Sequence, residues 1–241
     1  MNEEYFSGGY YLARRAKRES YMSPELIPPE VLSGSVCICD FFPDDWAIEW
    51  VSLSDEERLK AAASFGIAPD HLGDIVAWAT EGLSKTFGWP SAFYTLQAAK
   101  EARVALLPRD ASVVAFGLGL HANHVEDFLE AARPPATKEG FAPVADTGIY
   151  QCVSARENIA EGGRFAGFEL LSTLTGLLTC SWLCNGLERE CAAQLGIRTN
   201  EHGFVATHLE ALRCAEFISS DEVGAEPGLW LPWRVTIYAE P

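Results

Sequence analysis

The stretch SVVAFGLGL, residues 112–120, is the clearest strand signal in the chain and the best starting point for deriving the fold. It is almost continuously apolar and contains two adjacent β-branched residues, a pattern that predicts a buried strand. The next stretch, HANHVEDFLEAAR at residues 121–133, predicts a helix that ends at Pro134-Pro135, because proline cannot continue a helix. The sequence therefore predicts a buried strand followed directly by a helix.

The residues before this strand predict mainly helices. Ser54 and Glu57 have capping-box spacing and predict a helix that ends at Gly66. Pro69 suits the first turn of a second helix, which we expect to reach about Thr86. A third helix is expected from about residue 91 to residue 107. Upstream of all three, residues 35–42 predict a short strand.

The residues after position 140 mix strands and helices. We expect strands at 148–153 and 164–171, joined by the turn Glu161-Gly162-Gly163, and a final strand at 229–239. Helices are expected at 181–195 and 204–218. Regular strand–helix–strand alternation is absent from this pattern, so the predicted class is α+β, with mixed helices and a mainly antiparallel sheet. It fits a compact single domain or two closely packed subdomains.

Three regions follow from these expectations. Residues 1–20 contain the basic run Arg14, Arg15, Lys17 and Arg18 in a Gly- and Tyr-rich leader, which we expect to be a loosely ordered arm. Residues 21–140 form a mainly helical half and residues 141–241 an α+β half, with 134–146 as the candidate linker.

The charge balance narrows the choice of function. The 241 residues have a formal net charge of -16. An acidic surface repels nucleic-acid phosphates and anionic lipids, so we expect neither as a partner. The first 20 residues contain no apolar run typical of a signal peptide, and we expect a cytoplasmic protein whose seven cysteines are reduced.

The acidic residues are concentrated between residues 21 and 80, where eleven acidic side chains face two basic ones. Within this region Asp44, Asp45, Trp46 and Glu49 combine carboxylates with a large aromatic residue, a mixture that suits a protein interface. The alternative is that the aromatic residues here are core and the carboxylates are a solvated rim. We expect the partner contact on these four residues.

A second candidate contact is the loop Asn200-Glu201-His202-Gly203. A histidine beside a carboxylate can perform acid–base chemistry, so Glu201 and His202 also suggest a catalytic alternative. The simpler interpretation is a turn before a helix, in which Asn200 reverses the chain and Gly203 adopts a positive φ.

Metal and thiol chemistry remain alternatives. His121 and His124 can share one face of a helix and bind a metal ion, but the sequence shows no third ligand. Cys184 lies near a predicted helix start and, with His202, suggests a cysteine hydrolase. Cys37 and Cys39 would share one face of a strand, and we expect both to be core residues rather than ligands.

Most of the chain shows a resemblance. The segments GFELL, SWLCNGLE and NEHG, within residues 167–203, resemble a group of uncharacterised bacterial cytoplasmic proteins. Such proteins are similar in style to the immunity proteins of bacterial toxin systems, being small, acidic and cytoplasmic. The resemblance implies no catalytic residue.

These observations favour an acidic binding protein without a cofactor. The expected function is that of an immunity protein, which neutralises a cognate toxin by direct contact, because net charge of this sign steers a protein to a basic partner. The alternative is a metal-dependent hydrolase or a Cys/His hydrolase. The oligomeric state is left open by the sequence.

Overall fold

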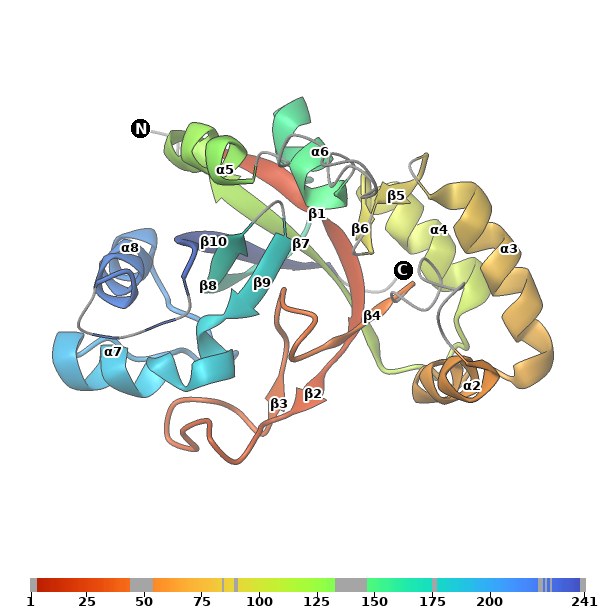
Figure 1. Ribbon diagram of the computed structural model, residues 1–241, viewed down its shortest axis with the longest axis horizontal. Coiled ribbons are helices and arrows are strands. Elements are labelled where there is room, and N and C mark those ends of the chain that lie inside the picture. Colours follow the sequence, from red (N-terminus) through yellow and green to blue (C-terminus); the bar gives the residue numbers. More distant parts are fainter. Residues whose placement is uncertain are drawn as a thin grey trace.

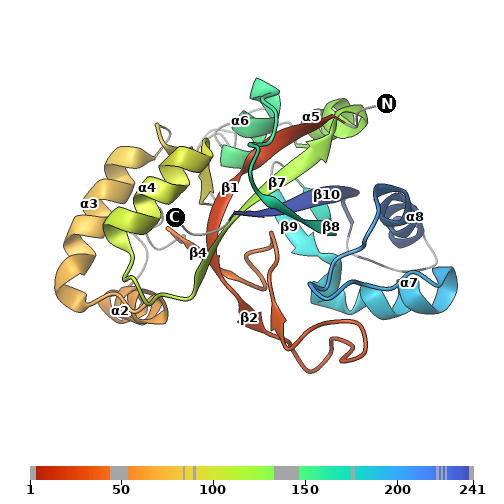
Figure 2. The same cartoon turned by 180° about the vertical axis from the view of Figure 1, so that it is seen from behind.

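The computed structural model describes residues 4–43, 54–83, 85–88, 91–132, 147–174, 177–220 and 227–238, together with residues 223 and 225. It confirms the α+β class: one large antiparallel sheet crosses the molecule, and helices pack around it (Figure 1). Helices α2 (Asp55–Ser64), α3 (Leu72–Gly82) and α4 (Leu96–Leu106) lie at one end. Helices α7 (Leu187–Leu195) and α8 (His208–Ile218) lie at the other end, and α5 (Val125–Ala131) and α6 (Gly148–Ala155) lie along a third side. The reverse view shows the same grouping (Figure 2).

Four long strands make the centre of the sheet. They are β1 (Tyr5–Arg14), β7 (Val113–His121), β10 (Leu229–Tyr238) and β8 (Arg164–Leu174), and each is antiparallel to its neighbour in that order. Shorter strands complete it: β9 (Leu177–Ser181) pairs with β8, β6 (Ala92–Phe93) and β4 (Asp40–Phe42) pair with β1, and β5 (Phe87–Gly88) pairs with β6. A separate ladder joins β2 (Ala16–Lys17) to β3 (Glu30–Val31).

The strand predicted at 112–120 is confirmed as β7, between β1 and β10. Its residues Phe116, Leu118 and Leu120 are completely buried. Val113 and Ala115, on the opposite face, are also buried, and this burial of both faces is the physical reason for the continuous apolar sequence of β7.

The predicted helices of the first half are largely confirmed. Helix α2 (Asp55–Ser64) begins at the Ser54–Glu57 capping box, and the 3-10 turn η1 (Pro69–His71) leads into α3 (Leu72–Gly82). Helix α4 (Leu96–Leu106) begins later than predicted, because the Thr95 side chain caps its first turn.

The second half differs from the prediction at residues 148–153 and at strand β9 (Leu177–Ser181), which the sequence pattern does not predict. Residues 148–153 belong to helix α6 (Gly148–Ala155), whose buried residues Gly148, Ile149, Cys152 and Val153 recur at helical spacing. The remaining helical segments are η2 (Ala122–His124), α5 (Val125–Ala131), η4 (Trp182–Asn185), α7 (Leu187–Leu195) and α8 (His208–Ile218). The predicted strands at 164–171 and 229–239 are confirmed as β8 and β10.

The expectation of a loosely ordered N-terminal arm needs correction. Half of residues 1–20 forms β1, an inner strand, because Tyr10, Tyr11, Leu12 and Ala13 are apolar enough to be buried. The basic run follows it: Arg14 pairs with Asp40, and Arg18 donates a hydrogen bond to the Ile27 carbonyl. The strands of the two halves form one continuous sheet, in which β5, β6, β1 and β7 of the first half meet β10, β8 and β9 of the second half where β7 pairs with β10. The candidate linker, residues 134–146, lies outside the described residues.

Three groups of buried residues pack against this sheet. One lies beneath α5, α6 and the segment around Phe41, a second beneath α7 and α8, and a third beneath α2, α3 and α4. The sheet is shared by all three, and this arrangement makes the described residues one compact unit.

A close approach of two glycines joins β5 to α6. A Cβ atom on Gly88 would lie 2.5 Å from the Gly148 Cα and 2.7 Å from its nitrogen, both backbone atoms that cannot rotate away. We expect Gly88→Ala to lower the free energy of unfolding by about 3 kcal/mol, because overpacked sites must move backbone. Gly73→Ala is the control: nothing lies within 4 Å of its Cβ position. Denaturant unfolding that gave equal stabilities for the two variants would contradict this account.

Candidate functional site

The predicted contact residues Asp44, Asp45, Trp46 and Glu49 lie outside the described residues. The structure does describe the acidic residues that follow them in the sequence, on η1 and α3. Asp70 on η1 and Asp74 and Glu81 on α3 are all exposed, and their spacing places them along one side of the helix. Within the described part of the chain, none of the three carboxylates forms an ion pair or a hydrogen bond.

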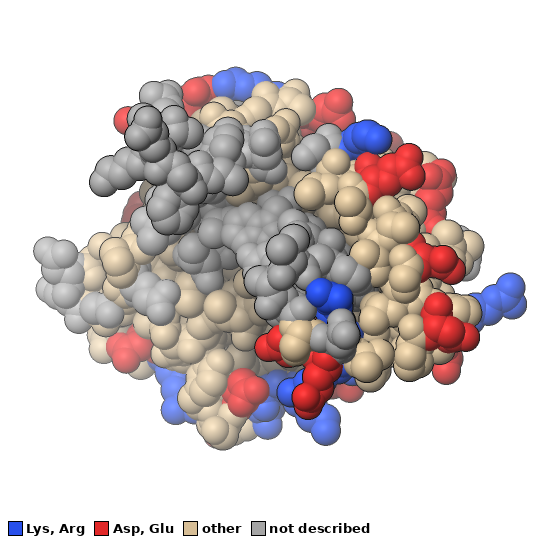
Figure 3. All heavy atoms as spheres, turned by 45° about the vertical axis from the view of Figure 1, so that its right-hand side comes forward, with Lys and Arg blue, Asp and Glu red and all other residues tan. Residues whose placement is uncertain are grey.

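The surface view turns this end of the molecule toward the reader. Acidic side chains form most of the charged surface along the right-hand side of Figure 3. We call Asp70, Asp74 and Glu81 the α3 acidic row. Gly73 and Ala77 are exposed on the same segment and have little or no side chain, so a partner could approach the helix closely.

The loop around Asn200 has the turn geometry expected of it. The Asn200 amide oxygen accepts hydrogen bonds from the His202 and Phe204 nitrogens at 2.9 and 3.2 Å, and its amide nitrogen donates to the Ala166 carbonyl at 2.8 Å. Gly203 has a φ of +82°. The structural interpretation of this loop is therefore confirmed.

The acid–base interpretation of the same loop is weakened by a third side chain. His202 Nε2 lies 3.7 Å from Glu201 Oε1, but it is also in direct contact with the Arg164 guanidinium. Burial, followed by the Arg164 charge, lowers the pKa of His202, and Glu201 opposes this shift. A neutral imidazole that accepts a hydrogen bond from an arginine is occupied, so it is poorly placed to take a proton from a substrate.

Three of the five histidines meet at one end of the sheet. The rings of His121 and His208 are stacked with centroids 4.6 Å apart, and the His124 ring lies 6.0 Å from His121 and 5.9 Å from His208. Sequence reasoning found His121 and His124 but missed His208, because α8 begins more than 80 residues later and no local pattern reports that contact.

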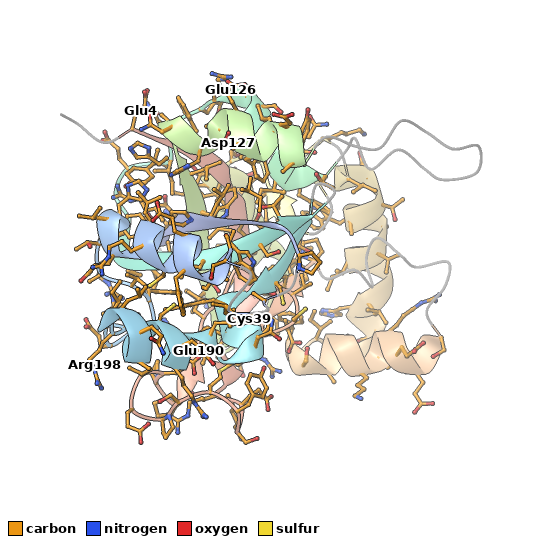
Figure 4. All side chains as sticks on the ribbon, turned by 60° about the vertical axis from the view of Figure 1, so that its left-hand side comes forward. Glu4, Cys39, Glu126, Asp127, Glu190 and Arg198 are labelled. Atoms are coloured by element: carbon orange, nitrogen blue, oxygen red, sulfur yellow. The ribbon has the colours of Figure 1, made fainter. Side chains whose placement is uncertain are left out.

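Aromatic residues surround this histidine cluster. The Tyr5 ring lies 5.2 Å from His121 and 5.9 Å from His208, and the Arg234 guanidinium lies 5.1 Å from the centroid of the Tyr5 ring. Figure 4 shows Glu4 and Asp127 at the same end of the molecule. In the described residues, no group of three His, Cys, Asp or Glu side chains is arranged to hold a metal ion. The geometry therefore gives the alternative metal site at His121 and His124 no support.

The cluster predicts a pH dependence of stability. Burial, then the neighbouring His121, lowers the pKa of His124, while Asp127 opposes the shift. A histidine whose pKa is lowered on folding binds its proton more weakly in the folded state, so stability falls as the pH drops through its titration range. We expect His124 to contribute a decrease in melting temperature as the pH falls from about pH 7 to pH 5, measured as the difference between wild type and a variant without this imidazole.

His124→Gln should reduce that slope, because the side chain can no longer become charged. The exposed His71 on η1 is the matched control, and His71→Gln should retain the wild-type slope. Thermal unfolding across this pH range checks both variants, and equal slopes for them would contradict a role for the cluster.

The structure does not bring together Cys184 and His202, the two residues of the alternative cysteine hydrolase. Cys184 lies beside Ser35, with Sγ and Oγ 3.9 Å apart, while His202 contacts Arg164. Cys37, expected in the core, is exposed, because residues 36–39 form a turn in which Ser35 O accepts hydrogen bonds from the Ile38 and Cys39 nitrogens. Cys39 is buried as expected, and burial raises the pKa of its thiol to about 12.

A buried carboxyl group lies close to these thiols. Glu169 on β8 is completely buried and accepts hydrogen bonds from the hydroxyls of Ser33 and Ser181, at 2.5 and 2.7 Å, and from the Gly34 nitrogen at 2.8 Å. Burial raises the pKa of Glu169 to about 7, and the three hydrogen bonds offset this only in part. These contacts fasten residues 33–34 to β8 and β9.

One pocket of about 220 Å³ lies beside the irregularity in β1 between Ser7 and Tyr10. Burial raises the pKa of Cys152, which lines it, to about 12, so this thiol is not a nucleophile at neutral pH. The other polar lining residues are Ser7, Tyr94, Thr95, Gln151 and Glu157.

Comparisons with known proteins add no constraint. No family model matches the chain, and neither the curated proteins nor the solved structures include a match. Among the described residues, no helix has the length and apolar character needed to cross a membrane.

Proposed function

We propose that the protein binds a basic protein partner and inhibits it, as the immunity proteins of bacterial toxin systems do, and that it acts in the cytoplasm. The α3 acidic row is the observation that carries this proposal. Its three carboxylates are exposed on one side of an 11-residue helix and the turn before it, and none is paired within the described residues.

An unpaired row of like charges favours a partner of opposite charge. The carboxylates repel one another, and arginine or lysine side chains from a partner would relieve that repulsion. The net charge of -16 adds a long-range field that speeds association with a basic surface and weakens as salt screens it. A toxin that acts on nucleic acid or nucleotides has such a surface, and the row would occupy its phosphate subsites.

The proposal keeps the sequence-based contact as a second part. Asp44, Asp45, Trp46 and Glu49 immediately precede α2 in the sequence and would extend the acidic surface with an aromatic anchor. Glu201, the exposed acidic residue of the loop at 200–203, stays a further candidate, whereas His202 is occupied by Arg164.

Affinity capture tests the proposal. Immobilised wild-type protein should retain a basic protein from a lysate of its native host at low salt and release it at high salt. The variant Asp70→Asn/Asp74→Asn/Glu81→Gln should retain much less of the same protein. Capture of an acidic partner, or equal capture by both proteins, would refute the proposal.

A further inference from the structure

The structure brings two cysteine residues that are far apart in the sequence to one serine side chain. Ser35 Oγ lies 3.9 Å from the Sγ of Cys184, on η4, and accepts a hydrogen bond from the Cys37 backbone nitrogen at 3.3 Å. One side chain therefore contacts both cysteine residues. Tyr21 marks the same place: burial raises its pKa, and the nearby thiols of Cys184, Cys180 and Cys37 contribute to that shift.

Accessibility separates these two cysteines from the others. Cys37 is exposed and Cys184 is half-buried, whereas the remaining five are buried, namely Cys39, Cys152, Cys180, Cys191 and Cys214. An oxidant in solution can thus reach Cys37 directly, and Cys184 is partly accessible. Because thiol oxidation depends on exposure as well as on pKa, these two cysteines are the most accessible to an oxidant.

The local backbone favours their approach. Cys37 belongs to the turn at residues 36–39, and Cys184 belongs to a four-residue 3-10 segment followed by Gly186, whose φ is +66°. Neither cysteine is held inside a long helix or strand. The segments next to the two cysteines are nevertheless anchored to the sheet, because Ser33 and Ser181 both donate hydrogen bonds to the carboxyl group of Glu169. The segments that carry Cys37 and Cys184 are therefore held to the same carboxyl group, and disulfide formation requires the Cys37 side chain to turn toward Cys184.

We propose that Cys37 and Cys184 form a redox-sensitive pair that closes into a disulfide when the protein meets a hydroperoxide. The Cys37 thiolate attacks one oxygen of hydrogen peroxide, the O–O bond breaks, and Cys37 becomes a sulfenic acid while hydroxide leaves and takes up the proton that the Cys37 thiol released, forming water. The Cys184 thiolate then attacks the Cys37 sulfur, the S–S bond forms and the S–O bond breaks, and the hydroxide that leaves takes up the proton released by the Cys184 thiol to form a second water. Two electrons pass from the two sulfurs to the peroxide.

The test treats reduced full-length protein with one equivalent of hydrogen peroxide and blocks remaining thiols under denaturing conditions. Wild-type protein should lose about 2 Da before alkylation, and peptide mapping should find Cys37 joined to Cys184, reversibly with dithiothreitol. Cys37→Ser and Cys184→Ser should each abolish the cross-link. Cys39→Ala, a neighbour in the same turn, should retain it.

A second readout distinguishes the two roles. Cys184→Ser leaves the Cys37 sulfenic acid without its partner thiol, so trapping with dimedone should increase on Cys37 relative to wild type. Circular dichroism of each variant confirms that it is folded. Joining of Cys37 to any other cysteine, a dimer linked through Cys37, or overoxidation of Cys37 without a cross-link would overturn the proposal.

Discussion

Replacing Glu169 by alanine is expected to lower the free energy of unfolding by about 3–5 kcal/mol, since removal of one partner from a buried polar network strands the others. The Ser33 and Ser181 hydroxyls and the Gly34 nitrogen would lose their shared acceptor inside a completely buried site. Chemical denaturation measures the loss. A stability within about 1 kcal/mol of wild type would show that this network does not hold residues 33–34 in place.

The same carboxyl group predicts an opposite pH dependence from that of His124. Its pKa is raised to about 7 in the folded protein, compared with 4.5 for a free side chain. Between those values the folded state keeps a proton that the unfolded state has lost, so stability falls as the pH rises and levels off above about pH 7. The full effect is about 3 kcal/mol.

Glu169→Gln separates charge from hydrogen bonding. Glutamine cannot ionise, so this variant should lose the decline between about pH 4.5 and pH 7 while it keeps part of the network. Exposed Glu201→Gln is the control and should retain the wild-type pH profile. If Glu169→Gln and Glu201→Gln gave the same profile, Glu169 would not be the group that titrates.

Neutralising the α3 acidic row is expected to slow association with the captured basic partner by about tenfold at low salt, because charge steering can raise association rates 10- to 1,000-fold. A matched triple variant tests whether position or total charge matters. Glu161→Gln/Glu190→Gln/Glu216→Gln removes the same number of exposed carboxylates. Glu190 and Glu216 lie on α7 and α8, at the opposite end of the sheet from α3 (Figure 1). This control variant should associate nearly as fast as wild type.

Much of the fold follows from local sequence. Continuous apolar character identified β7, and the capping box at Ser54 identified the start of α2, because both signals involve residues that are close together in the chain. Residues 148–153 were assigned to a strand, although the spacing of Ile149, Cys152 and Val153 suits a helix that packs on β1. A short apolar segment fits either structure, and only tertiary packing decides between them.

The candidate sites depend more heavily on distant contacts. Part of the α3 acidic row could be anticipated from the acidic composition of residues 21–80, which includes Asp70 and Asp74, and helical spacing aligns Glu81 with them. The buried position of Glu169 could not be anticipated from the sequence. A lone glutamate in an apolar strand does not indicate that the hydroxyl group of Ser33, far away in the sequence, will hydrogen-bond to it. The prediction that residues 1–20 form a loosely ordered arm was wrong for the same reason. The strands that pair with β1 and bury it come from distant parts of the chain, residues 40–42, 92–93 and 113–121.

The most direct test of the proposed function is the association rate constant with the captured partner, measured against salt concentration for wild type and both triple variants. We predict that the wild-type rate falls steeply as salt increases, that the α3 variant shows a shallower dependence, and that the two converge at high salt. The Glu161/Glu190/Glu216 variant should follow wild type. Identical rates and salt dependences for the α3 variant and wild type would contradict the claim that this surface binds the partner.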